Sequence, residues 1–146
     1  MKPTAHSPNC PNCGASQGII LRKGRFEGTY NKLPITIEDA EEYFCKNCGE
    51  EFYTRDQDRR LSQHILDAAR QKLGILQPDQ IIAIRKNLGL SQESMEDLLG
   101  LGDKVVTRWE TGRVVPGKTT DILLRLLSKH PGLVNDLRSI KQEAFT

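Results

Sequence analysis

All four cysteines of the chain lie in two short motifs, and these motifs constrain the fold more than any other feature. They read Cys10-Pro-Asn-Cys13-Gly and Cys45-Lys-Asn-Cys48-Gly. A C-x-x-C turn presents two thiolates to one side of a metal ion, and structural zinc prefers four such ligands in a tetrahedron. Gly14 and Gly49, directly after the motifs, permit the left-handed backbone that such turns use. We therefore predict one closed, structural Zn²⁺ site per chain, with the ligands Cys10, Cys13, Cys45 and Cys48.

Two other uses of paired cysteines fit this sequence less well. A redox dithiol usually occurs once, in a thioredoxin-like βαβ context that is absent here. A catalytic zinc keeps one position open for water and usually includes histidine or a carboxylate, whereas these motifs use every cysteine in the chain. A module of about 45 residues buries little apolar core, so a metal would supply much of its folding free energy.

Length and composition indicate a folded protein with one ordinary domain or two small ones. The chain has 146 residues, of which 37% are hydrophobic and 27% are charged. No apolar run approaches the roughly 18 residues of a transmembrane helix, and residues 1–13 lack the apolar core of a signal peptide. We therefore expect a cytoplasmic protein.

The net charge of +2 is too small to indicate nucleic-acid binding by itself. Any case for nucleic-acid binding therefore rests on where the basic residues lie.

The amino-terminal third has the composition of a small β-sheet. We predict strands over residues 19–26 and 30–37, joined near Gly28, and a shorter pair around 43–45 and 51–53. Between these two pairs stands an acidic group, which we interpret as a solvated loop: Glu38, Asp39, Glu41 and Glu42.

A helix is predicted over residues 55–73, where apolar residues recur at every fourth position from Leu61 to Leu73. Thr54 or Asp56 is its expected cap, and Gly74 its expected end. The fold class is thus a two-domain α+β protein. A β-rich zinc-binding module (residues 1–54) is followed by a connecting helix (55–74) and an all-α helix-turn-helix domain (75–146).

The carboxy-terminal half has the pattern of a helix-turn-helix motif. We predict a first helix over residues 78–88 and a second from Ser91, as N-cap, to Leu99. Gly100 is the expected left-handed stop, and a third helix is expected over residues 102–111. Trp109 is expected to anchor the core. The surplus of leucines near the carboxy terminus indicates a homodimer seam in addition to the core.

In this motif the third helix lies in the DNA major groove and its early outward residues meet base edges. Arg108 can donate to guanine O6 and N7 together, and Lys104, four residues earlier, is expected on the same face. Other residues are expected to hold the phosphate backbone. The full set of predicted DNA contacts is Ser91, Gln92, Lys104, Thr107, Arg108, Arg113, Lys118 and Thr119.

These residues carry a family resemblance. The strings Leu90-Ser91-Gln92-Glu93 and Thr107-Arg108-Trp109-Glu110-Thr111-Gly112 resemble the Xre class of lambda-repressor-like regulators, with Trp109 in place of a tyrosine. Glu96 departs from the class, which has a small residue where two helices cross. We expect either a wider crossing or a Glu96 that bends out to solvent. With the cysteine motifs included, residues 9–138 resemble the MqsA antitoxin family, also described as the YgiT-type zinc-finger family.

The resemblance implies a function. Members are antitoxins of type II toxin–antitoxin systems, with a structural zinc, an amino-terminal module that masks an mRNA-cleaving toxin, and a carboxy-terminal domain that dimerises on a palindromic operator. The family reads bases with an asparagine and an arginine four positions later, whereas this chain has Lys104 and Arg108. Because lysine prefers guanine and asparagine prefers adenine, we expect a different operator sequence.

We therefore predict an antitoxin that also represses its own operon. The alternative is a stand-alone zinc-containing regulator whose amino-terminal module binds another protein or a signal. An enzyme is not expected, because no nucleophile, base and orienting group are grouped in the sequence.

Overall fold

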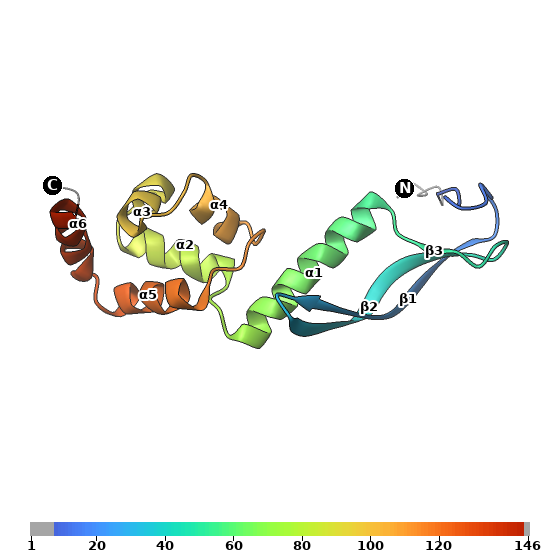
Figure 1. Ribbon diagram of the computed structural model, residues 1–146, viewed down its shortest axis with the longest axis horizontal. Coiled ribbons are helices and arrows are strands. Elements are labelled where there is room, and N and C mark those ends of the chain that lie inside the picture. The colour runs from blue at the N-terminus through green and yellow to red at the C-terminus, as the bar shows by residue number, and fades with distance from the viewer. Residues whose placement is uncertain (1–7, 145–146) are drawn as a thin grey trace. The chain divides into compact units, whose positions relative to one another are not determined.

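The computed structural model describes residues 8–144 of the chain (Figure 1). The chain divides into two compact units, the first ending at Ala68 and the second beginning at Ala69. The division falls inside helix α1 (Arg55–Leu73), so this helix contributes residues to both units. Over residues 8–144, no helix combines the length and the apolar character needed to cross a membrane. The expected α+β fold is confirmed, with a three-stranded antiparallel sheet followed by a helical region.

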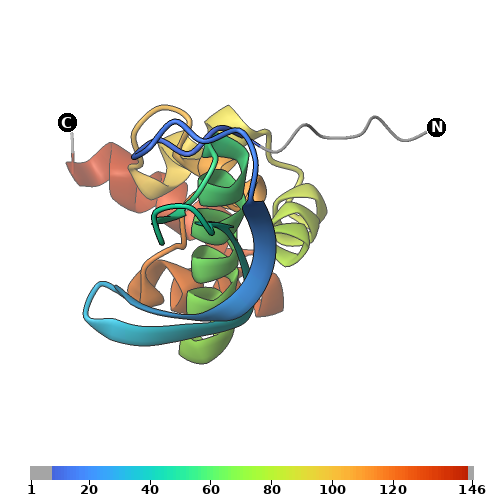
Figure 2. The same cartoon turned by 90° about the vertical axis from the view of Figure 1, so that its right-hand side faces the viewer.

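The sheet of the first unit is mainly one long hairpin. Strand β1 (Ile19–Tyr30) pairs with β2 (Leu33–Cys45), and the two-residue strand β3 (Glu51–Phe52) extends the sheet on the other side of β2. The register shifts between Gly24 and Phe26, and the hairpin bends along its length (Figure 2). An irregularity of this kind locally bends and twists a strand pair.

The predicted join of the two long strands near Gly28 is wrong, because the chain reverses at Asn31 and Lys32. Both residues have positive φ, 47° and 69°, as a tight two-residue hairpin turn requires. Gly28 instead lies within β1, opposite Ile35. A Cβ atom there would stand 2.8 Å from the Phe26 ring. The glycine therefore makes room for an aromatic side chain and does not form the turn.

The predicted acidic loop is also wrong, because its four residues are part of strand β2. Three of the four carboxylates form ion pairs with arginine or lysine side chains, so the acidic group lies on the surface of the sheet. The ion pairs are Arg22–Glu42 at 2.7 Å, Arg60–Glu41 at 3.8 Å, Lys23–Glu41 at 4.0 Å and Arg25–Glu38 at 4.0 Å.

Helix α1 spans the residues that the sequence predicts. Its start is fixed by a reciprocal pair: Gln57 N–H donates to Thr54 Oγ1 at 3.2 Å, and Thr54 N–H donates to Gln57 Oε1 at 2.9 Å. This arrangement is a capping box, and it satisfies two amide donors at the end of the helix. Thr54, rather than Asp56, is therefore the cap. Gly74 follows the last helical residue with φ at 65°.

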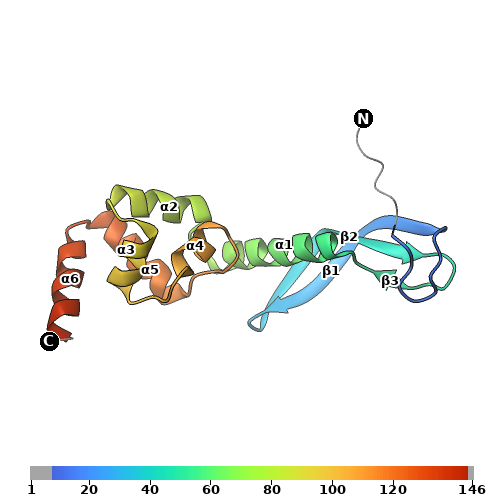
Figure 3. The ribbon, with the colours of Figure 1, turned by 90° about the horizontal axis from the view of Figure 1, so that it is seen from above.

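The second unit is a bundle of short helices around one apolar core (Figure 3). The helices are α2 (Pro78–Asn87), α3 (Gln92–Leu99), α4 (Val105–Glu110), α5 (Lys118–Lys129) and α6 (Leu133–Ala144). Helix α2 packs against α4 and α5, while α3 packs against α4 and α6. Met95, Val106 and Leu124 are fully buried in this core, and Trp109 lies among them as predicted.

Candidate metal centre and nucleic-acid interface

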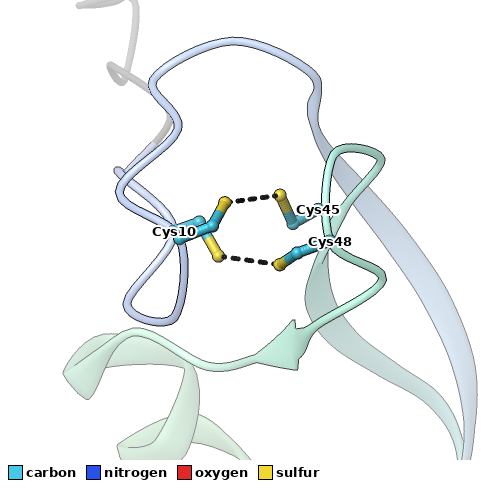
Figure 4. A group of neighbouring side chains, drawn as sticks. Cys10, Cys45 and Cys48 are labelled. Atoms are coloured by element: carbon cyan, nitrogen blue, oxygen red, sulfur yellow. Dashed lines mark hydrogen bonds between the residues drawn. The ribbon is translucent and has the colours of Figure 1, made fainter.

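The four cysteine sulfurs form one cluster in the first unit (Figure 4). All four lie within 4.8 Å of one another. The sulfurs of Cys10 and Cys48 are 3.6 Å apart, and those of Cys13 and Cys45 are 3.7 Å apart. Zinc–sulfur bonds of about 2.3 Å in a tetrahedron place neighbouring sulfurs about 3.8 Å apart. The cluster therefore has the dimensions of a tetrathiolate metal site.

The two motifs present their cysteines by the same local structure. Each first cysteine carbonyl accepts the amide of the glycine that follows its motif, at 2.9 Å for Gly14 and 2.8 Å for Gly49. Both glycines have positive φ, 74° and 80°, as the sequence predicts. In each motif the first cysteine is buried and the second is exposed. The ion would therefore lie at the surface edge of a small core that includes Phe52.

The sulfurs differ in how readily they ionise. The Asn47 side-chain amide donates to Cys13 Sγ at 3.3 Å and lowers the pKa of this thiol to about 6. At Cys45, backbone amides of Cys48 and Asn47 lower the pKa, but burial and the neighbouring sulfurs raise it, and the result is about 11. Crowded sulfurs thus oppose full deprotonation of the cluster. A divalent cation removes this opposition, so the donor set fits a bound metal.

The second unit contains the predicted helix-turn-helix. Ser91 caps α3, with its Oγ accepting the Ser94 amide at 3.0 Å. Gly100 ends α3 in the left-handed region, with φ at 67°. Helix α4 begins at Val105, three residues later than predicted. Lys104 is its N-cap, with φ at 64°, so Lys104 precedes α4 and does not lie on its helical face beside Arg108.

The predicted DNA contacts fall into two groups. Six of the eight are exposed, and these are Ser91, Lys104, Arg108, Arg113, Lys118 and Thr119. The other two, Gln92 and Thr107, are half-buried and bond to each other, with Thr107 Oγ1 donating to Gln92 Oε1 at 3.1 Å. Lys118 also contacts the Leu73 carbonyl at 3.4 Å. Of the exposed residues, Arg108 lies on α4 and carries a charged side chain.

Comparison with known proteins decides the family. A family model described as "Antitoxin component of bacterial toxin-antitoxin system, MqsA" matches residues 8–138. Antitoxin MqsA of Escherichia coli (strain K12) is 31% identical over 130 residues, which cover 88% of this chain and 98% of that protein. The chain belongs to the MqsA antitoxin family. It is the antitoxin of a bacterial toxin–antitoxin system, and the family is not enzymatic, as expected.

A second relative matches only part of this MqsA-family antitoxin. Antitoxin HigA-2 of Vibrio cholerae serotype O1 (strain ATCC 39315 / El Tor Inaba N16961) is 29% identical over 65 residues, covering 44% of this chain and 62% of that protein. The similarity lies in the carboxy-terminal part, which contains the helix-turn-helix. Family membership thus supports DNA binding by the antitoxin's second unit.

Sequence reasoning missed a buried polar network that joins three helices of the antitoxin. Arg85 Nε on α2 donates to Glu110 Oε1 on α4 at 2.6 Å, and the Glu110 side chain is only 4% exposed. Gln92 Nε2 on α3 donates to the other Glu110 oxygen. Arg85 also donates to the Leu90 carbonyl at 3.0 Å. Because these partners are far apart in the sequence, no local pattern indicates the network.

The structure of the antitoxin tests one of the two expectations for Glu96, its exposure to solvent. Glu96 does not bend out to solvent, since only 8% of the residue is exposed. Its Oε1 accepts the backbone amide of Val106 at 3.1 Å, on the helix that α3 crosses. The crossing therefore places the carboxylate inside the motif.

Proposed function

We propose that this antitoxin has three linked properties. It holds one structural Zn²⁺ on Cys10, Cys13, Cys45 and Cys48. As a homodimer in the cytoplasm, it binds a palindromic operator and represses its own operon. Through its amino-terminal module, it binds and neutralises a partner toxin that cleaves mRNA.

The proposal of a structural zinc is supported by the cluster geometry. Sulfur separations of 3.6 and 3.7 Å agree with four zinc–sulfur bonds of about 2.3 Å. The chain offers four ligands in two similar turns, so a bound ion has no position left for water. Such an ion would hold the two motifs together and supply folding free energy, which is the role of closed zinc sites.

The observation that carries the DNA-binding proposal is the exposed Arg108 on α4. This helix is the third of the helix-turn-helix, after α2 and α3. Helices in this position enter the major groove, and an arginine there can read guanine with two hydrogen bonds. Lys104, Arg113, Lys118 and Thr119 surround this helix in sequence and are exposed. They are suited to phosphate contacts, which position the protein without reading bases.

The DNA-binding proposal predicts different effects for two neighbouring arginines. Arg108→Ala should lower the preference for operator over random DNA by about 1–3 kcal/mol, because a base contact is lost. Arg113→Ala is the matched control, and it should weaken binding to both DNAs by a similar factor. Titrations with operator and scrambled duplexes at one fixed salt concentration provide the measurement. An unchanged operator preference in Arg108→Ala would refute its assignment as a base-reading residue.

The toxin-binding proposal is supported by the surface of the first unit. Ile20 and Tyr53 expose 36% and 40% of their areas. The Tyr53 hydroxyl donates to Glu42 at 3.4 Å, and Ile20 lies in the same cross-strand row as Phe44 and Glu51. Exposed apolar side chains grouped with charge are typical of protein-binding surfaces. Carboxylates next to them would complement a basic ribonuclease.

Co-expression tests the toxin-binding proposal. We expect the antitoxin to capture the product of the neighbouring gene and to suppress cleavage of RNA by it. The variant Ile20→Asp should weaken this capture and leave operator binding unchanged. A neighbouring product that neither binds the antitoxin nor cleaves RNA would remove the support for a ribonuclease partner and favour a stand-alone regulator.

A further inference from the structure

Glu96 contacts both the turn after α3 and the start of α4. Its backbone carbonyl accepts the amide of Leu101 at 2.8 Å, in the turn after α3. Its side-chain Oε1 accepts the amide of Val106 at 3.1 Å, in the first turn of α4. One residue on α3 therefore fixes two successive points of the segment that leads into α4.

The Val106 amide needs a partner from outside its own helix. The first amides of a helix have no partner within it, and Val106 is completely buried, so water does not serve it. The N-cap residue Lys104 has a left-handed backbone and gives no side-chain cap. Glu96 supplies the missing acceptor from the neighbouring helix. In turn, the amide satisfies a carboxylate oxygen that is costly to bury alone.

We propose that Glu96 is a positioning residue for DNA recognition, which sets the placement of α4 against α3 and so the direction of Arg108. Helix α4 has only six residues, Val105–Glu110, so its few internal hydrogen bonds restrain it weakly. Its far end is held by Glu110, which binds Arg85 and Gln92. Glu96 holds the near end. A recognition side chain must be held to about 0.5 Å for productive contact, and both anchors lie within one turn of Arg108.

Three variants separate the hydrogen bond from the charge. Glu96→Gln removes the charge but keeps an oxygen that accepts the Val106 amide. Glu96→Asp keeps the charge but is too short to reach it, and Glu96→Ala removes both. The control is Glu93→Ala, because Glu93 lines the same hollow between α3 and the start of α4 but is exposed.

The first measurement is amide hydrogen exchange at Val106 without DNA. Loss of the acceptor should speed exchange about tenfold in Glu96→Ala and Glu96→Asp, as for a buried donor left unpaired. Glu96→Gln and Glu93→Ala should exchange at the wild-type rate. Should Glu96→Ala fail to fold, Glu96→Asp alone carries this comparison. An unchanged rate in a folded Ala or Asp variant would overturn the proposal.

The second measurement rests on the proposed DNA binding and compares affinities for operator and random duplexes. Glu96→Ala and Glu96→Asp should reduce the operator preference at least about fivefold, the effect of one lost base contact. Glu96→Gln should keep the operator preference of the wild-type protein. If Glu96 acted only by repelling phosphate, Glu96→Gln and Glu93→Ala would both bind the two duplexes more tightly, and the positioning role would be refuted. Wild-type protein with no operator preference would instead refute the proposed function, while the exchange experiment would still test the hydrogen bond.

Discussion

The two units of this antitoxin reach a folded state by different means. In the first unit, the cluster around the cysteines consists of Cys10, Cys45 and Phe52, with Ala15, Ile19 and Tyr43 packed against it. In the described part of the second unit, eleven buried residues form one continuous core, from Leu76 to Val134. Apolar burial contributes about 25 cal/mol per Å², so the second unit has a large hydrophobic contribution and the first a small one.

The difference shows where a small module obtains its stability. Outside the cysteine cluster, the first unit consists of the long hairpin and most of helix α1. Ile35 and Ala40 are buried there, and its surface carries ion pairs such as Arg25 with Glu27. Exposed ion pairs of this kind contribute only about 0–1 kcal/mol each. Tyr43 and Phe52 stack with ring centroids 5.7 Å apart and add one aromatic contact. The remaining candidate for a large contribution in the first unit is a metal at the four cysteines.

The largest expected effect is therefore the loss of the metal. Cys45→Ser replaces a fully buried ligand, and structural zinc contributes about 10–16 kcal/mol in small zinc-dependent folds. We expect the variant, or wild-type protein treated with a chelator, to lose the metal and the fold of the first unit. The second unit should stay folded. Elemental analysis gives the metal identity and stoichiometry, and amide spectra of each unit give the fold.

The control for this experiment is Ser16→Ala, an exposed substitution close to the first motif that leaves all four sulfurs in place. It should keep one metal per chain. A Cys45→Ser protein with full metal content would contradict the tetrathiolate site. Loss of the second unit's fold on chelation would show that the two regions are not independent.

Local patterns in the sequence predicted the parts of the molecule whose partners are close along the chain. The spacing of Cys10 and Cys13 indicates a metal turn because the turn itself brings two sulfurs together. In the same way Ser91 caps a helix through an amide only three residues away. Thr54 and Gln57 form their box within one helical turn. Each of these arguments needs no knowledge of the tertiary fold.

Features that depend on distant partners could not be predicted in this way. Glu96 meets Val106, and Arg85 meets Glu110, only after α3 and α4 have packed. The prediction that the hairpin turns near Gly28 was wrong for a related reason. Gly28 is a turn signal by type, but the structure uses it to make room for the Phe26 ring. A residue type indicates which local conformations are possible, and the packing of neighbouring side chains determines which one is adopted.

A smaller effect is expected from a single change in the hydrophobic core of the second unit. Leu124 is completely buried, whereas Leu126, on the same helix α5, is 44% exposed. Leu124→Ala should lower the free energy of unfolding of the second unit by about 2–5 kcal/mol, because it removes buried contacts and leaves a cavity. Leu126→Ala is the matched control and should change it by about 0.5 kcal/mol or less. Urea unfolding followed by the fluorescence of Trp109, a buried reporter in this core, measures both.

The metal content of both variants should equal that of the wild type, since the four cysteines lie in the other unit. Equal destabilisation by the two leucine variants would contradict the placement of the core, and release of metal by Leu124→Ala would show that the second unit supports the first.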